Sequence, residues 1–259
     1  ESTDSFGYFD LLEGTAVITV NPAFDFEYCE ILPKSKGIIP EINDGIITFS
    51  TDTADDFTLL FDGNYEGNVL QIFVNPQESD IPEKGSPTVI YVEPGYYDER
   101  NNPFRLLSGD TLYIAGGAFI EGGVINAVDA DNITVRGRGI ISQGENISQG
   151  VLFDNCENVK LEGIICNKRY TGWSGQIKDC DNVTVERYRV VSPILYSTDG
   201  LNIVCSKNVT YRDCYFRTGD DCVSIKGGTN TAPSDIPVDN ILIENCTLWS
   251  DGNNAVAIG

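Results

Sequence analysis

A short pattern recurs through the second half of the chain at intervals of about 25 residues. Each copy begins with Asn, which is followed by an apolar residue, a residue of any kind, and an apolar or aromatic residue. The copies start 26, 24, 26 and 32 residues apart, at Asn132, Asn158, Asn182, Asn208 and Asn240. A period of this length, made of short alternating segments without a helical pattern, is typical of a solenoid whose coils stack on one another. The repeat therefore predicts a parallel β-helix.

Apolar residues eight positions after each repeat Asn fit the same coils. They are Ile140, Cys166, Val190, Phe216 and Leu248. We expect the repeat Asn side chains to point inward and to bond to one another along the stack instead of carrying glycans, although Asn132, Asn182 and Asn208 each open an Asn-x-Thr sequon. The longest interval contains residues 227–238, which are rich in Gly, Pro, Asp and Thr and predict an extra loop.

A column of side chains is predicted by four segments that share one pattern. In each of them, one residue lies two places before a short strand that ends in Ile. The residues at this position are Trp173, Asp199, Asp221 and Asn254. If the segments belong to successive coils, these side chains lie above one another at roughly the 4.8 Å spacing of neighbouring strands. Asp220 precedes Asp221 and is expected to point to a different side of the chain.

The chain ahead of the repeats has a different pattern. Apolar runs at residues 15–20, 45–50, 57–61 and 69–74 alternate with Asp, Asn, Gly and Pro. Short strands separated by turn residues are typical of an antiparallel β-sandwich. We therefore expect an all-β chain with a small antiparallel β-sandwich over residues 1–85 and a parallel β-helix over residues 86–259, whose C-terminal coils are incomplete.

Two motifs inside the repeat carry a family resemblance. Ser197–Gly200 reads Ser-Thr-Asp-Gly, Gly219–Ile225 reads Gly-Asp-Asp-Cys-Val-Ser-Ile, and 21 residues separate Asp199 from Asp220. In order and register these motifs resemble the centre of the polygalacturonase-type enzymes of glycoside hydrolase family 28, which are right-handed parallel β-helices. The resemblance covers roughly residues 88–259. The opening sandwich, residues 92–124 and residues 248–259 resemble the related dextranase-type family 49 more closely.

The chain differs from the polygalacturonase pattern in two places. Polygalacturonases usually carry a His in the coil after the paired aspartates, where this chain has Asn254, and the whole chain contains no His. They also carry a later Arg-x-Lys that binds the substrate carboxylate, and the chain ends at Gly259 before that coil. The resemblance therefore leaves pectic galacturonan and a neutral α-glucan as alternative substrates.

Carboxylates crowded on one face suit the hydrolysis of a glycosidic bond. The reaction needs an acid to protonate the leaving oxygen and a base to activate water. We expect Asp220 to be the acid and Asp199 with Asp221 to activate the water, and the resemblance implies the same roles. The crowding should raise at least one carboxyl pKa, as a general acid at neutral pH requires. The configuration of the sugar carbon would be inverted if acid and base lie about 6.5–9.5 Å apart.

Three further side chains are candidates for substrate binding. Trp173 is expected either to stack on a sugar ring or to belong to the core. Lys226 would either bond to the substrate or be a solvated charge, and Asn254 would either contact the substrate or belong to a ladder. Lys168 and Arg189 are expected to be solvated surface charges.

The composition of the chain limits the classes of molecule that it can bind. A formal net charge of −22 disfavours nucleic acid and anionic membranes, because phosphate binding needs clustered Lys and Arg. No run of 18 apolar residues that could span a bilayer is present in the sequence. Several of the eight cysteines recur at equivalent coil positions, which favours interior thiols over a metal site. We expect a polysaccharide or oligosaccharide partner, no metal or cofactor, and a secreted or periplasmic location; the oligomeric state is left open.

Two other functions fit the same architecture. A pectate-lyase-like enzyme would eliminate instead of hydrolysing, and would need bound Ca²⁺ and an Arg or Lys base. A non-catalytic carbohydrate-binding β-helix would tolerate Asp220→Asn, whereas a hydrolase would lose several orders of magnitude in turnover. The order and register of the aspartate motifs favour an inverting glycoside hydrolase over both.

Overall fold

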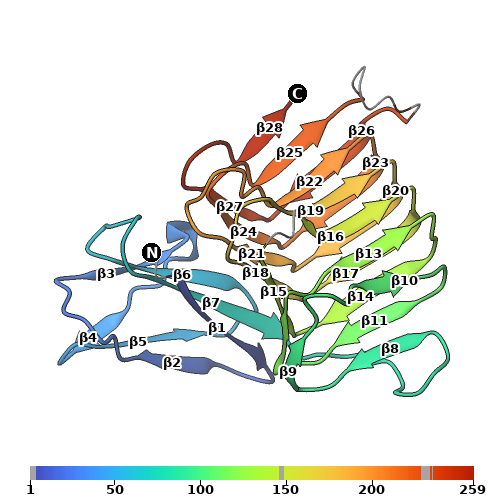
Figure 1. Cartoon of the computed structure of the whole chain (residues 1–259). Coiled ribbons are helices and arrows are strands. Elements are labelled where there is room, and N and C mark those ends of the chain that lie inside the picture. The colour runs from blue at the N-terminus through green and yellow to red at the C-terminus, as the bar shows by residue number, and fades with distance from the viewer. Residues whose placement is uncertain (1–3, 146–148, 229–233, 235) are drawn as a thin grey trace. The chain divides into compact units, whose positions relative to one another are not determined.

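The computed structural model describes residues 4–145, 149–228, 234 and 236–259. The chain divides into two compact units, Glu1–Asp80 and Ile81–Gly259. Nearly all regular structure in the described residues is β-strand (Figure 1), apart from a short 3-10 helix at Lys34–Lys36.

The first unit is a sandwich of two small sheets, with strand orders β1-β7-β6-β3 and β2-β5-β4. Its strands are β1 (Asp4–Leu11), β2 (Ala16–Val20), β3 (Cys29–Leu32), β4 (Glu41–Asn43), β5 (Ile46–Thr51), β6 (Asp56–Phe61) and β7 (Val69–Pro76). Apolar side chains from both sheets, among them Ile31, Phe49 and Leu59, form one buried cluster. The predicted sandwich is confirmed with one difference, because β1 pairs with β7 in parallel. These two strands are not joined by a hairpin, so no tight turn forces them to be antiparallel.

The second unit is a right-handed parallel β-helix, as predicted. Each coil contributes one strand to each of three seven-stranded sheets (Figure 1). The first sheet contains β8 (Val89–Val92), β11 (Thr111–Ile114), β14 (Ile133–Gly137), β17 (Glu157–Glu162), β20 (Asp181–Glu186), β23 (Lys207–Arg212) and β26 (Asp239–Glu244). The second contains β9 (Gly95–Asp98), β12 (Ala118–Glu121), β15 (Ile140–Gln143), β18 (Ile165–Lys168), β21 (Arg189–Val191), β24 (Tyr215–Thr218) and β27 (Thr247–Ser250). The third contains β10 (Phe104–Leu106), β13 (Ile125–Val128), β16 (Gln149–Asp154), β19 (Trp173–Lys178), β22 (Leu201–Val204), β25 (Val223–Lys226) and β28 (Val256–Ile258).

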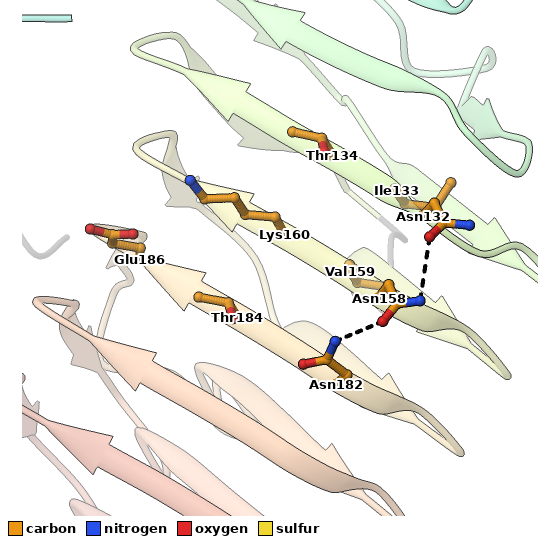
Figure 2. Close-up of a pocket in the computed structure, with 9 residues that line it drawn as sticks. All are labelled: Asn132, Ile133, Thr134, Asn158, Val159, Lys160, Asn182, Thr184 and Glu186. Atoms are coloured by element: carbon orange, nitrogen blue, oxygen red, sulfur yellow. Dashed lines mark hydrogen bonds between the residues drawn. The ribbon is translucent and has the colours of Figure 1, made fainter. Parts of the chain in front are cut away.

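The five Asn-led segments lie on neighbouring strands of the first sheet, from β14 to β26. Their amides form the predicted ladder: Asn158 Nδ2 donates to Asn132 Oδ1 at 3.3 Å, and Asn182 Nδ2 donates to Asn158 Oδ1 at 2.6 Å (Figure 2). The ladder is interrupted at Asn208, whose Nδ2 donates to Asp181 Oδ1 instead. The ladder prediction is therefore confirmed for most coils.

The inward orientation expected for these Asn side chains is wrong. All five repeat Asn residues are exposed, and their φ angles lie between 50° and 59°. Asn adopts this left-handed conformation more readily than most residues, and it turns the chain at the corner of the coil. The inward positions belong to the following strand residues, such as Ile133 and Val135. The repeat selects Asn for its backbone conformation and its outward ladder.

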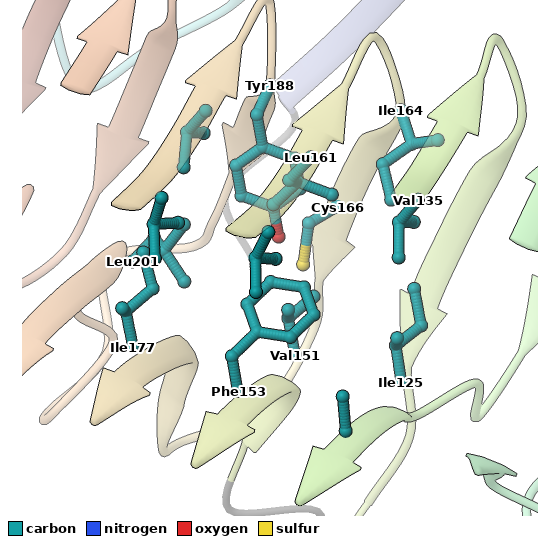
Figure 3. Packing of buried hydrophobic residues seen from close by; sticks show 14 of the residues in the cluster. Ile125, Val135, Val151, Phe153, Leu161, Ile164, Cys166, Ile177, Tyr188 and Leu201 are labelled. Carbon is teal, nitrogen blue, oxygen red and sulfur yellow. The ribbon is translucent and has the colours of Figure 1, made fainter. Parts of the chain in front are cut away.

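Stacked apolar side chains fill the interior of the coils (Figure 3). Val135 pairs with Leu161 and Leu161 pairs with Val185, and all three are fully buried. Each coil therefore covers the apolar face of the next one, as a solenoid requires. All eight cysteines are free and seven are buried, in agreement with the interior thiols expected.

Half of the predicted extra loop at residues 227–238, namely residues 229–233 and 235, lies outside the described residues. Within the part of the chain that the structure describes, none of the helical structure has the length and apolarity needed to cross a membrane.

Candidate active site

The third sheet brings the predicted column together. Gly175 pairs with Leu201, Ile203 with Ile225, and Val223 with Val256, so the residues two places before each strand are also in register. Backbone hydrogen bonds continue this register beyond the strands. Ser174 N donates to Asp199 O at 2.8 Å, Gly200 N donates to Asp221 O at 2.9 Å, and Cys222 N donates to Asn254 O at 2.9 Å. Trp173, Asp199, Asp221 and Asn254 thus occupy equivalent places on four consecutive coils.

Two glycines allow the aspartate segments to approach each other. A Cβ on Gly200 would lie 2.2 Å from the carbonyl oxygen of Cys222 on the next coil. A Cβ on Gly219 would lie 2.6 Å from both Leu195 N and Pro193 O. Because these contacts are with backbone atoms, a side chain at either position would push the coils apart. The Asp-Gly and Gly-Asp-Asp motifs are therefore close-packing motifs as well as carriers of carboxylates.

Asp199 is the most buried of the three carboxylates, with 4% of its surface exposed. Its Oδ2 accepts a hydrogen bond from Asn202 Nδ2 at 2.9 Å. Burial raises the pKa of the Asp199 carboxyl above its ordinary value; the Asn202 bond opposes the rise, and the charges of Asp220 and Asp221 add to it. The expectation that one carboxyl would have a raised pKa is confirmed, although burial contributes more than crowding.

Asp221 has the opposite electrostatic environment. Its Oδ2 accepts a hydrogen bond from Ser224 Oγ at 2.7 Å, and the same hydroxyl lies 3.4 Å from Asp199 Oδ2. Its Oδ1 accepts bonds from Asn254 N at 3.1 Å and Asn254 Nδ2 at 2.9 Å. Burial alone would raise the pKa of Asp221, but these hydrogen bonds and the nearby charge of Lys226 outweigh it and lower the pKa. Asp221 is therefore set up to be ionised.

Asp220 points to a different side of the chain from Asp221, as expected. Its Oδ2 accepts the backbone N–H of Ser197 at 3.1 Å, and its Oδ1 accepts Asn253 Nδ2 at 2.8 Å and the N–H of Asp221 at 2.9 Å. Its own carbonyl oxygen accepts bonds from Thr218 Oγ1 at 2.6 Å and Ser250 Oγ at 2.8 Å. Residues of the neighbouring coils thus donate hydrogen bonds to both the side chain and the backbone of Asp220.

Trp173 and Lys226 contact each other. The Lys226 ammonium lies 4.6 Å from the centre of the Trp173 ring, a cation–π contact that covers one face of the indole. The Lys226 charge also helps to lower the pKa of Asp221, and it opposes the rise that burial causes in the pKa of Asp199. The structure therefore places both predicted binding residues beside the aspartates, with their side chains already paired.

Two outward side chains of the site escaped the sequence analysis. Asn202 and Ser224 are the middle residues of the strand triplets Leu201–Ile203 and Val223–Ile225. Ser224 N donates to Asn202 Oδ1 at 2.8 Å, which orients the amide toward Asp199. The alternation of strand residues could have identified both, because the residue between two inward apolar residues must face outward.

The expectation that Lys168 and Arg189 are solvated is wrong, since only 2% and 1% of their surfaces are exposed. Lys168 lies two residues after the buried Cys166, so strand alternation directs it into the coil. Its Nζ contacts Thr171 O at 3.5 Å. Burial lowers the pKa of Lys168 to about 8, against the opposing charges of Cys166 and Asp199.

The aspartate cluster is separate from the hollow on the first sheet. That hollow has a volume of about 520 Å³ and is lined by residues of β14, β17 and β20 together with the Asn ladder (Figure 2). It contains none of the three aspartates. Among the described residues, no group of three His, Cys, Asp or Glu side chains has an arrangement suited to a metal ion.

Relatives and solved structures share this architecture. The chain is 35% identical over 81 residues to a polygalacturonase of Arabidopsis thaliana, a match covering 30% of this chain and 18% of the relative. It is 23% identical over 231 residues to isopullulanase of Aspergillus niger, which covers 71% of this chain and 39% of the relative. Both matches span less than two thirds of the relative's length.

Two solved structures have a similar fold at low sequence identity. Dex49A from Penicillium minioluteum has a TM-score of 0.54 and 16% identity, covering 92% of this chain and 63% of its own. The family 28 exopolygalacturonase of Yersinia enterocolitica has a TM-score of 0.51 and 11% identity, covering 82% of this chain and 62% of its own.

A family model also matches the sequence of this chain. The model for glycosyl hydrolases family 28 matches residues 46–256, a range that contains all three aspartates and the coils that carry them. With its motifs in register on a parallel β-helix, the chain belongs to glycosyl hydrolases family 28.

Proposed function

We propose that the protein is an inverting glycoside hydrolase that cleaves a polysaccharide, with Asp199, Asp220 and Asp221 as its catalytic carboxylates. The observation that carries this proposal is the approach of two carboxylates from adjacent coils. The Ser224 hydroxyl lies 2.7 Å from Asp221 Oδ2 and 3.4 Å from Asp199 Oδ2, whereas Asp220 is bonded elsewhere, to Ser197 and Asn253. Two neighbouring carboxylates and a third apart from them can divide the roles of base and acid.

In the proposed reaction, Asp220 donates its proton to the oxygen of the leaving sugar. Asp199 and Asp221 hold a water molecule between them and accept its proton as the oxygen attacks the sugar carbon from the opposite face. The bond from that carbon to the leaving oxygen breaks, and the leaving sugar departs with the proton from Asp220. One displacement with a separate acid and base gives a product of inverted configuration.

The substrate is proposed to be either a polygalacturonate or a neutral α-glucan. The names of the two relatives support these alternatives, one being a polygalacturonase and the other an isopullulanase. The net charge of −22 favours the neutral glucan, because long-range repulsion slows the encounter with a polyanion. Since polymers of this kind lie outside cells, we propose that the protein is secreted or periplasmic.

Release of reducing sugar from polygalacturonate, dextran, pullulan and rhamnogalacturonan tests the proposal. Activity on at least one is expected, together with a loss of several orders of magnitude in Asp220→Asn. NMR of the first product formed should show an inverted anomeric configuration. An unsaturated product whose formation stops in EDTA would indicate a lyase, and an unaffected Asp220→Asn variant would indicate a protein without this catalytic centre.

The division of roles needs its own test, because the raised pKa belongs to Asp199. A good leaving group needs little protonation, so the variant that lacks the acid should retain activity on an activated glycoside. We expect Asp220→Asn to cleave such a substrate at a rate close to wild type and Asp199→Asn to remain inactive on it. The reverse result would assign the acid role to Asp199.

A further inference from the structure

Three consecutive large apolar residues are exposed beside the aspartates. Ile194, Leu195 and Tyr196 have 40%, 41% and 85% of their surfaces exposed. They form the tip of the loop that leads from β21 to the Asp199 segment. An exposed run of this kind is unfavourable in water and is usually retained for a contact with another molecule.

This tip is held firmly by the residues on either side of it. Thr198, which is fully buried, donates through Oγ1 to Leu195 O at 2.7 Å. Leu195 N donates to Pro193 O at 2.9 Å, and the backbone of both residues packs on Gly219 so closely that a Cβ there would lie 2.6 Å from each. The tip is therefore preorganised, which reduces the entropy lost when a ligand binds.

The loop is also bonded to one specific carboxylate. Ser197 N, the residue after Tyr196, donates to Asp220 Oδ2 at 3.1 Å. In the proposed reaction Asp220 protonates the oxygen of the leaving sugar. The sugar that carries this oxygen must therefore lie on the side of the site where Asp220 and the tip are joined.

The Tyr196 ring has more aromatic surface free to stack on a sugar than the Trp173 ring has. Lys226 covers one face of the Trp173 ring, whereas none of the described residues makes a ring contact with Tyr196. A tyrosine ring combines an apolar face with a polar hydroxyl, and it loses little conformational entropy on binding. Such a ring suits the apolar face of a pyranose, whose hydroxyls lie around its edge.

We propose that residues 194–196 form the binding site for the sugar on the leaving-group side, with the Tyr196 ring stacked on the apolar face of that pyranose. Ile194 and Leu195 flank the ring and exclude water from the contact. This inference rests on the proposed function, since it takes Asp220 as the acid.

The test compares two substrates that share the cleaved sugar and differ in the leaving group. One is the polysaccharide that the wild type hydrolyses, and the other is the glycosyl fluoride of the same sugar, whose leaving group has no ring. Tyr196→Ala is expected to raise KM for the polysaccharide by roughly tenfold, equivalent to about 1.4 kcal/mol, and to spare the fluoride. Tyr196→Phe should restore the wild-type KM.

The control variant is Tyr96→Ala, which removes an exposed tyrosine on β9, far along the stack from the third-sheet aspartates. It should match the wild type on both substrates. A Tyr196→Ala variant that matches the wild type on the polysaccharide, or that loses equal activity on both substrates, would overturn the inference. A wild type that cleaves neither substrate would instead contradict the proposed function.

Discussion

Asn254 donates two hydrogen bonds to Asp221, one from its backbone N–H at 3.1 Å and one from its side-chain amide at 2.9 Å, both to Oδ1. Asn254 stands where polygalacturonases usually have a His. The sequence allowed it to be either a substrate contact or a ladder residue, and in the structure it is hydrogen-bonded to a carboxylate of the preceding coil.

The first prediction concerns this contact. Asn254→Ala removes the side-chain bond, which helps to lower the Asp221 pKa against the effect of burial. The pKa of Asp221 should therefore rise, and the acidic limb of the kcat/KM profile should move to higher pH. Profiles of the wild type and the variant on the same substrate would show the shift. An unmoved acidic limb would mean that Asp221 does not control it.

The second prediction is an opposite effect on stability at Asp199 and Asp221. The raised pKa of Asp199 means that its contribution to stability is full below the unfolded pKa and is lost as pH rises through the folded pKa. Asp221 has a lowered pKa, so its contribution is present above the unfolded pKa and is lost as pH falls. At pH 7, Asp199→Asn should stabilise the fold and Asp221→Asn should destabilise it.

Urea denaturation of both variants at pH 7 and about pH 3 would check this second prediction. The two differences from wild type should shrink as pH falls, because protonation of the carboxyls removes the charges that cause them. Both variants should lose activity, so a gain in stability at Asp199 would separate catalysis from folding. Equal destabilisation by both substitutions would contradict it.

The third prediction concerns the buried Lys168. Its pKa falls from 10.5 to about 8 on folding, so the unfolded chain binds more protons between these values and stability rises with pH there. Below about pH 8 the buried charge is unfavourable, and Lys168→Met should stabilise the protein by about 2–3 kcal/mol at pH 7. The gain should diminish toward pH 10.5. Lys160→Met, at a position 44% exposed, should change stability by less than about 1 kcal/mol.

The fourth prediction concerns an ion pair behind the site. Arg217 Nε lies 3.0 Å from Asp251 Oδ2, and both side chains are almost fully buried. Asp251→Ala should lower the free energy of unfolding by about 3 kcal/mol, because it removes the carboxylate from a buried guanidinium. The control is Glu244→Ala, which breaks the exposed pair with Arg212 and should have an effect below about 1 kcal/mol. Similar losses in both variants would contradict the argument from burial.

The fifth prediction concerns thiol reactivity. Burial is the main cause that raises the pKa of Cys29 and of Cys222 to about 12, so neither should react with a thiol reagent at pH 8 while the protein is folded. Cys246 is the half-buried thiol, and a hydrogen bond from Cys214 lowers its pKa. The pKa of Cys156 is also lowered, but that thiol is buried, so the more exposed Cys246 should react first and Cys246→Ser should remove this fast phase. All eight thiols should react in denaturant.

Much of the β-helix could be predicted because its coils repeat the same local constraints. Each Asn-led segment needs a left-handed corner and an alternating strand. The repeat Asn indicates the corner, and the alternation of apolar residues over the next few positions indicates the strand. The aspartate column followed from the same register. Its supporting residues, Asn202 and Ser224, lay at the outward positions of strands that had already been identified.

The remaining differences arise where a single additional residue changes the register or where a charged residue occupies an inward strand position. The spacing from the repeat Asn made Ile140 the equivalent of Cys166, but Ile141 pairs with Cys166 and is buried. From Val135 to Ile141 is six positions, whereas from the equivalent Leu161 to Cys166 is five, so the turn around Gly137 has one additional residue. Lys168 was expected to be solvated because of its charge, whereas strand alternation places it on the same side as the buried Cys166.

The parallel stack also determines which changes in chain length the site can tolerate. Deletion of one whole coil that precedes the aspartates, such as the stretch from Asn132 to Asn158, would shorten the β-helix by one coil. Asp199 and Asp221 would remain on adjacent coils in the same register. Loss of a single residue between Asp199 and Asp221 would instead rotate one carboxylate away from the other. A lineage with this fold can therefore grow or shrink by complete turns while its reaction chemistry stays the same.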